Sequence, residues 1–287
     1  MARFTFARGN TKRLLSAPLY ALGGMASLMV RRRADSWVFA CGSGLGEGAL
    51  ALALYAREQN PELSITWLAR DADELRRANE LGLPSVLHSG WQGFRRTLRA
   101  QLVVVTHGLG DANRFGVRGA FVVQLWHGIP LKRIQLDSAV TFESSFAPAK
   151  RMLRQMYRRS ASAIRLVPAA GELAALRLRT AFGLPNDRVV VTGDPRDDVL
   201  LQGTDESRRT RARQLLETTI SDLGNAQVLL YAPTWRDGER DPSIPSGDEW
   251  RLIADHLEAT GSLLLLRPHP HSVGDYGDEP RVSTRIW

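Results

Sequence analysis

From residue 36 onward, short apolar segments alternate with longer segments in which apolar residues recur at helical spacing. The short segments have the length and the aliphatic content of buried strands, and turn residues bound them. We predict strands at 37–41, 64–69, 85–88, 102–106, 120–125, 163–167, 188–192, 227–231 and 262–266. We predict helices at 48–57, 71–81, 91–99, 150–159, 171–182, 205–218 and 248–259. This alternation is typical of an α/β fold in which helices cover both faces of a parallel sheet.

An irregular, basic stretch at 137–162 separates the alternation into two series. We therefore expect two Rossmann-like domains that face a cleft, one at 34–160 and the other at 161–287. The second series is short for such a domain, with one further strand expected at 281–286. We expect this second domain to be incomplete.

Residues 1–33 have a different pattern, with an uncharged run at 14–30 between basic residues on both sides. The run has ~17 residues, the lower limit for spanning a bilayer, and Pro18 and Gly23 interrupt it. The basic residues on both flanks set no orientation across a membrane, and three arginines stand where a signal peptide would be cleaved. We predict that 1–33 lies on an anionic membrane surface. The alternative is a helix packed on the first domain, with solvated arginines.

The charge balance favours an anionic partner, since 38 Lys and Arg residues against 30 Asp and Glu residues give a net charge of +8. Anionic membranes, phosphate-rich substrates and nucleic acids all meet this condition. No platform of alternating aromatic and basic residues supports nucleic-acid binding. The single cysteine, Cys41, excludes an intramolecular disulfide, and no histidine and carboxylate spacing resembles a zinc site. We expect neither a metal nor a cofactor.

A glycine-rich turn at 42–48 follows the first predicted strand and opens a helix, as dinucleotide-binding turns do. The dinucleotide fingerprint fails, because Glu47 or Ala49 stands where its last glycine is needed. We interpret the segment as a tight turn that lines the cleft.

Four segments place a polar or cationic residue beside glycine or proline directly after a predicted strand: 125–131, 193–196, 231–236 and 266–271. The carboxyl ends of parallel strands meet at one edge of a sheet, where ligands bind. We therefore expect one cleft to collect His127, Arg196, Thr234, Arg236, Arg267 and His269. Guanidinium groups, a hydroxyl and imidazoles suit a diphosphate ligand.

Each of these residues also has a simpler interpretation. An arginine alone is more often part of a surface ion pair, and Asp194 and Asp197 are available as partners. His127 alone is more often a residue that stabilises its turn. We interpret His107 and His271 as structural.

The four segments together resemble the CDP-glycerol glycerophosphotransferase family, the teichoic acid polymerases and primases of bacterial walls. The matching residues are Trp126-His127-Gly128-Ile129-Pro130-Leu131-Lys132, Gly193-Asp194-Pro195-Arg196, Tyr231-Ala232-Pro233-Thr234-Trp235-Arg236 and Arg267-Pro268-His269-Pro270. The resemblance implies a GT-B-like fold with an acceptor domain at 34–160 and a CDP-glycerol-binding domain at 161–287. It also implies peripheral attachment to the cytoplasmic face of the cell membrane.

The implied reaction moves glycerol phosphate, or a related polyol phosphate, from CDP-glycerol to a lipid-linked teichoic-acid-type acceptor and releases CMP. His127 would match the family's general base, and we expect His269 to act with it as a catalytic residue. The expected substrate contacts are Gly128, Ile129, Pro130, Leu131, Arg196, Pro233, Thr234, Arg236, Arg267, Pro268 and Pro270. In this hypothesis the arginines, Thr234 and His269 stabilise the charge on the diphosphate as CMP leaves.

The chain departs from the family pattern in two places. The family's Asp-Tyr-Ser-Ser segment, which holds the phosphates of the donor, does not occur before Trp287, and Gly46-Glu47-Gly48 replaces an asparagine usual in the first helix turn. Two alternatives remain: a GT-B glycosyltransferase that uses a nucleotide sugar, and an inactive member that binds an anionic polymer or membrane. The sequence does not separate glycerol from ribitol donors, or primase from polymerase action.

Overall fold

A computed structural model of the protein describes residues 17–138, 142, 147–220, 223–233, 241–269, 276 and 286. The chain divides into two compact units between Gln202 and Gly203. The expected α/β class is confirmed, because both units contain parallel strands that alternate with helices.

The first unit is built on a seven-stranded sheet with the order β3-β2-β1-β4-β5-β6-β7. Its strands are β1 Arg33–Phe39, β2 Ser64–Ala69, β3 Ser85–Leu87, β4 Ala100–Val105, β5 Phe121–Gln124, β6 Ile164–Ala169 and β7 Val189–Val191. Every neighbouring pair is parallel. The chain builds outward from β1 in one direction and then returns to add β4 on its other side. The carboxyl edge between β1 and β4 is therefore a topological switch point, the usual place for a ligand in such sheets.

Both faces of this sheet are buried, which explains why its strands are apolar throughout. Val38 and Ala40 belong to one hydrophobic cluster, whereas Phe39 and Cys41 belong to the other. Helices cover both clusters: Ala53 of α3 packs into the second, and Phe182 of α7 packs into the first. Successive side chains of each strand point to opposite faces of the sheet, so each strand contributes to two separate cores.

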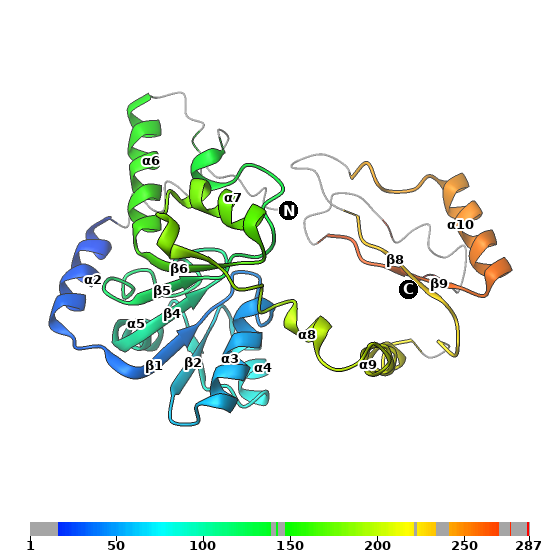
Figure 1. Ribbon diagram of the computed structural model, residues 1–287, viewed down its shortest axis with the longest axis horizontal. Coiled ribbons are helices and arrows are strands. Elements are labelled where there is room, and N and C mark those ends of the chain that lie inside the picture. Colours follow the sequence, from blue (N-terminus) through cyan, green and yellow to red (C-terminus); the bar gives the residue numbers. More distant parts are fainter. Residues whose placement is uncertain are drawn as a thin grey trace. The chain divides into compact units, whose positions relative to one another are not determined.

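The helices of the first unit are α2 Ala17–Met29, α3 Glu47–Gln59, α4 Ala72–Glu80, α5 Trp91–Arg99, α6 Ala147–Ser162, α7 Glu172–Phe182 and α8 Asp198–Leu201, with short 3-10 turns η1 Gln135–Asp137 and η3 Asn186–Arg188. Local signals define their ends. The Asp71 side chain accepts the Glu74 N–H at the start of α4, and Gly183 ends α7 in the left-handed conformation. Figure 1 shows α6 and α7 beside β6, and α3 and α4 toward β1 and β2.

The predicted domain boundary near residue 160 is wrong. Strand β6 pairs with β5 through Val122 and Ile164, and β7 continues the same sheet beyond β6. The basic connector is helix α6, which packs against β6 rather than linking two bodies. Pairing of β6 with β5 assigns residues 161–202 to the first unit, because strand hydrogen bonds require a shared sheet.

The second unit contains α9 Asp205–Glu217, β8 Val228–Tyr231, α10 Gly247–Thr260 and β9 Leu263–Leu266. Strands β8 and β9 are parallel, with Tyr231 opposite Leu266. A capping box between Ser246 and Glu249 starts α10, whose Trp250 is fully buried. Of the strand expected at 281–286, only Ile286 lies within the described residues, and it bridges to Leu264.

Within the segment expected at 1–33, the structure describes α2, which packs its glycine side on the first unit. A Cβ added to Gly23 would lie 2.2 Å from the carbonyl oxygen of Phe115, so the helix approaches that loop as closely as glycine allows. The opposite side exposes Leu22, Leu28 and Met29 at 57%, 75% and 86% of their surfaces. None of the helices in the described part of the chain has the length and apolarity needed to cross a bilayer.

Candidate functional site

The carboxyl ends of β1, β4 and β5 bring three segments together at the switch point of the first sheet. They are Cys41-Gly42 after β1, Thr106-His107 after β4, and Trp126-His127 after β5. His127 was predicted to lie at such an edge, and the structure places it there.

The imidazole of His127 contacts two other rings. The ring of His107 is parallel to it within 8°, with 4.1 Å between centroids, and the indole of Trp126 is 4.0 Å away at 33°. The His127 Nδ1 atom is 3.4 Å from the carbonyl oxygen of Thr106. A carbonyl oxygen only accepts, so this contact places the proton on Nδ1 and leaves the Nε2 lone pair free.

The backbone before His127 is strained, which is common at functional sites. Trp126 has a φ of +62°, in the left-handed region that a bulky residue rarely adopts. Its indole packs edge-on against Phe182 of α7, 5.4 Å between centroids. Packing against the core thus holds the turn that directs His127 toward the edge of the sheet.

His127 is held in its unprotonated form. Burial, followed by the positive charge of neighbouring His107, lowers the pKa of His127 to about 4. Glu47 and the Thr106 carbonyl oppose this shift, and Arg196 adds to it. At neutral pH the side chain is therefore a free base that can accept a proton.

His107 has the opposite environment. Burial lowers its pKa, but a hydrogen bond with Cys41 and the negative charge of Asp111 outweigh burial and raise the pKa of His107 above its ordinary value. One oxygen of Asp111 accepts the backbone N–H groups of Thr106 and His107 at 2.9 and 2.7 Å. Burial raises the pKa of Asp111, and these two donors oppose that effect by stabilising the ionised form.

Arg196 lies beside His127 as predicted, and its guanidinium group also forms the ion pairs of the simpler interpretation. Its Nη1 donates to the carbonyl oxygen of His127 at 3.1 Å and to Glu47 at 3.2 Å. Its Nη2 donates to Asp194 at 3.2 Å. Arg196 therefore ties the His127 turn to the start of α3. Its predicted contact with a phosphate stays a prediction.

The residues after His127 form an exposed turn. Gly128 has a φ of +137°, and the carbonyl oxygen of buried Pro130 accepts a hydrogen bond from Arg177 of α7 at 2.5 Å. Ile129 and Leu131 expose their side chains to solvent. The turn thus has a fixed backbone, with apolar side chains directed outward.

In the second unit, the structure brings two of the predicted segments together. Pro233 follows β8, and Arg267, Pro268 and His269 follow the neighbouring strand β9. The N–H of Arg267 donates to the carbonyl oxygen of Tyr231 at 2.9 Å, which holds the two strand ends side by side. Thr234, Arg236 and Pro270 lie outside the described residues.

His107, which we interpreted as structural, lies at the same edge of the sheet and stacks on His127. The available signal was its place after an apolar strand, the same placement that identified His127. From the sequence, Glu47 was considered only as a departure from the dinucleotide fingerprint and from the family pattern, yet it pairs with Arg196. Among the described residues, no three His, Cys, Asp or Glu side chains are grouped to hold a metal ion.

Comparison with known proteins gives the family context of this geometry. The family model for CDP-Glycerol:Poly(glycerophosphate) glycerophosphotransferase matches residues 25–282. A teichoic acid glycerol-phosphate transferase of Staphylococcus aureus is 25% identical over 153 residues, which cover 51% of this chain and 37% of that protein. The teichoic acid ribitol-phosphate polymerase TarK of the same species is 33% identical over 92 residues, 31% of this chain and 17% of that protein.

Among solved structures, a variant of the wall teichoic acid polymerase TagF soaked with CDPG matches 98% of this chain and 68% of that chain. The TM-score is 0.68 at 17% identity. The likeness shows that the chain has the GT-B-like α/β fold of TagF. The chain spans only 16% to 37% of the length of the curated relatives that it matches.

Proposed function

Because the chain belongs to the CDP-glycerol:poly(glycerophosphate) glycerophosphotransferase family, we propose that it transfers a polyol phosphate from a CDP-polyol to a lipid-linked acceptor. CMP is the second product. The observation that carries this proposal is the position of the His127 imidazole at the switch point of the sheet, with its Nδ1 atom facing the carbonyl oxygen of Thr106. A base at that edge can accept the proton that an attacking hydroxyl must lose.

In the proposed reaction, His127 Nε2 takes the proton of an acceptor hydroxyl as its oxygen attacks the phosphorus that bears the polyol. A new phosphorus–oxygen bond forms, and the bond from that phosphorus to the bridging oxygen breaks. CMP leaves with the bridging oxygen and its electron pair. The histidine then passes its proton to solvent or to the departing phosphate. Catalysis of this kind rests on positioning and charge stabilisation.

Cationic and hydroxyl groups of the second unit are the proposed donor contacts. Arg267 and His269 follow β9 at the edge where Pro233 follows β8. A guanidinium fork suits diphosphate oxygens, and prolines hold the local backbone rigid. The TagF structure soaked with CDPG supports a cytidine-diphosphate donor, and His269 is the proposed partner for the charge on the leaving phosphate. Thr234, Arg236, Pro268 and Pro270 are further proposed donor contacts of the second unit. Arg196 and residues 128–131 are proposed substrate contacts of the first unit.

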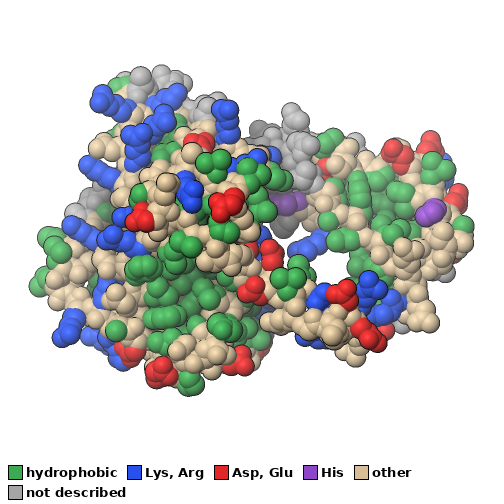
Figure 2. Space-filling model, viewed as in Figure 1, with side chains coloured by type: hydrophobic (Ala, Val, Ile, Leu, Met, Phe, Trp, Pro, Cys, Tyr) green, Lys and Arg blue, Asp and Glu red, His purple; other side chains and the backbone are tan. Residues whose placement is uncertain are grey.

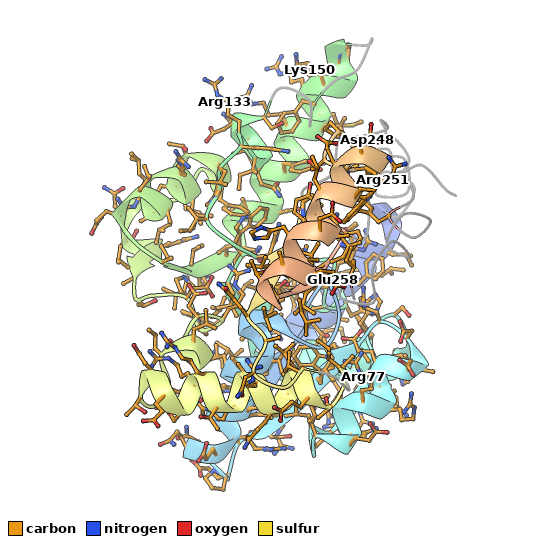
Figure 3. All side chains as sticks on the ribbon, turned by 90° about the vertical axis from the view of Figure 1, so that its right-hand side faces the viewer. Arg77, Arg133, Lys150, Asp248, Arg251 and Glu258 are labelled. Atoms are coloured by element: carbon orange, nitrogen blue, oxygen red, sulfur yellow. The ribbon has the colours of Figure 1, made fainter. Side chains whose placement is uncertain are left out.

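The proposed cellular place is the cytoplasmic face of the membrane, with α2 lying on an anionic surface. Its exposed side is apolar, and Arg31 and Arg33 follow it directly. Further basic side chains line α6, where Figure 2 shows them gathered, and Figure 3 labels Lys150 and Arg133 projecting outward. Apolar side chains can enter the bilayer boundary, and cations that follow them are attracted to anionic lipid headgroups.

The test is CMP release from CDP-glycerol and from CDP-ribitol in the presence of a lipid-linked acceptor analogue. His127→Ala should lower kcat by about 10²–10⁴, the usual contribution of a general base. His256→Ala is the matched control, since His256 is exposed on α10. Turnover by His127→Ala close to that of the unaltered protein would remove His127 from this role. Protection of the protein by a nucleotide sugar but by neither CDP-polyol would replace the proposal with a glycosyltransferase.

A further inference from the structure

Two histidines that follow neighbouring strands have stacked rings. His107 comes after β4 and His127 after β5, and their imidazoles are 4.1 Å apart and nearly parallel. Two protonated imidazoles at this distance repel each other strongly in a partly buried site. The pair therefore binds its first proton readily and its second only at much lower pH.

One residue orients both rings. Thr106 places its hydroxyl oxygen 2.8 Å from His107 Nδ1 and its carbonyl oxygen 3.4 Å from His127 Nδ1. The buried amide of Gln124 donates to the same carbonyl at 2.9 Å, which fixes its direction. The relative position of the two histidines is thus set by a buried backbone segment.

The glycine-rich turn provides the space for His107. A Cβ added to Gly42 would lie 2.6 Å from Cγ and 2.8 Å from Cβ of His107, closer than real carbon atoms approach. The N–H of Gly42 also donates to the Thr106 hydroxyl oxygen at 3.3 Å. The absence of a side chain at Gly42 is therefore required for the observed stack. The glycine-rich turn, which does not match the dinucleotide fingerprint, thus makes room for the His107 ring.

The charges around the pair favour a proton on His107. Asp111 and Cys41 flank His107, and Glu47 adds a weaker negative charge. On the His127 side, Arg196 is the facing cation, and its own charge is balanced by Glu47 and Asp194. Asp111 is thus tied to the backbone of His107, whereas Glu47 acts on both rings.

We propose that His107 is a positioning residue that carries the proton of the histidine pair, holds the ring of His127 by stacking, and so keeps His127 available as the base. The proposal rests on the function proposed above for His127. When the surroundings of two titratable groups shift their pKa values in opposite directions, one group serves as the acid and the other as the base.

The direct test is an NMR titration of the protein with isotope-labelled histidine. His107→Gln removes the charge, and the pKa of His127 should rise by about one unit or more, the threshold for coupled groups. His107→Phe keeps an aromatic ring but no charge, and should raise the pKa of His127 similarly while the His127 ring stays ordered. His88→Gln is the control, since the His88 ring contacts only the carbonyl oxygen of Ala69 among the described hydrogen bonds.

The reciprocal variant sharpens the test. His107 titrates while His127 is still neutral, so His127→Gln should change the pKa of His107 far less than His107→Gln changes that of His127. Unchanged titration of His127 in folded His107→Gln and His107→Phe would overturn the proposal. Equal shifts in both directions would also overturn it, because they indicate a general loosening of the site.

Activity provides a second readout. The acidic limb of kcat/KM should move to higher pH in His107→Gln by the same amount as the NMR pKa of His127, with kcat at alkaline pH retained. A loss of rate that is equal at every pH would contradict the proposal. If the unaltered protein does not turn over CDP-polyols, the proposed function fails, yet the NMR titration still decides the coupling.

Discussion

At the scale of single residues, neighbours rather than residue type decide what each side chain does. His107 and His127 are the same amino acid, each half-buried after a parallel strand. Burial acts on both rings. A hydrogen bond with Cys41 and the negative charge of Asp111 outweigh it at His107, whereas the positive charge of His107 adds to it at His127. The pKa of His107 is consequently raised and that of His127 lowered.

The lowered pKa of His127 predicts an unusual pH dependence. A free base loses activity when it becomes protonated, so kcat/KM should fall only as the pH drops through about 4, rather than near the ordinary histidine value of 6.5. A profile of kcat/KM for CMP release against pH, recorded with the unaltered protein, measures this acidic limb. A limb centred near 6.5 would show that His127 is not desolvated during the reaction, or that another group titrates.

Arg32 is predicted to be a structural residue despite its place in an arginine run. Its guanidinium group donates to the carbonyl oxygens of Thr97, Ala100, Gly116 and Arg118, at 2.9, 2.5, 2.8 and 2.6 Å. Burial lowers the pKa of Arg32 to about 10.

Arg32→Ala leaves these acceptors without a donor and should lower the free energy of unfolding by about 3 kcal/mol. Arg32→Lys should recover little of this lost stability, because an ammonium group lacks the planar set of donors of a guanidinium group. Urea unfolding measures the change, with exposed Arg31→Ala as control. Equal effects of Arg31→Ala and Arg32→Ala would contradict this assignment.

At the scale of elements, α2 combines the two interpretations offered for the amino-terminal segment. Gly23 and Gly24 pack against Phe115 and Arg118 of the first unit. The other side of the same helix is apolar and exposed. Packing and membrane contact are therefore compatible, because they use opposite sides of one helix.

The membrane proposal predicts that the exposed side of α2 supports vesicle binding. Replacing Leu22, Leu28 and Met29 together with glutamine should reduce co-sedimentation with anionic phospholipid vesicles at least tenfold, because each buried methylene contributes about 0.8 kcal/mol. Leu173 and Leu176 of α7 are 59% and 57% exposed, and their double glutamine variant is the control. If the α2 variant binds vesicles as well as the unaltered protein does, other parts of the chain must account for any membrane attachment.

At the scale of the whole molecule, strand pairing decides which residues form one body. The alternation of strands and helices continues through both units with little change in composition. Residues 161–202 nevertheless belong to the first unit, because β6 and β7 extend its sheet. Of the proposed substrate contacts, Arg196 and 128–131 consequently belong to the first unit, and those from Pro233 onward belong to the second unit, which begins at Gly203.

The donor role of the second unit predicts a split between binding and turnover. Arg267→Ala should raise the KM for CDP-glycerol about tenfold or more, as expected for loss of a charged hydrogen bond to phosphate, while kcat falls less. Arg251→Ala is the control, since Arg251 is exposed on α10 and pairs with Asp248 (Figure 3). A fall in kcat alone would place Arg267 in the chemical step instead of donor binding.

Hydrophobic periodicity determined the elements of this protein. Strand Ser64–Ala69 and helix Trp91–Arg99 have the predicted bounds, and most other elements differ from prediction by a few residues. This succeeded because the strands are buried on both faces and the helices carry local end signals such as Asp71 and Gly183. The placement of His127 at a strand end followed from the same local pattern.

The tertiary structure alone decided the unit boundary, the ion pairs of Arg196 and the stacking of His107 on His127. Each depends on which strands are neighbours, and strand order is absent from local periodicity. β1 and β4 are adjacent although 60 residues of chain separate Phe39 from Ala100, so Gly42 and His107 meet only in the folded sheet. The sequence by itself thus determined the elements and the edge where the base lies. Long-range strand pairing determined the charge on the residues around it, because electrostatic interactions depend on distance in space.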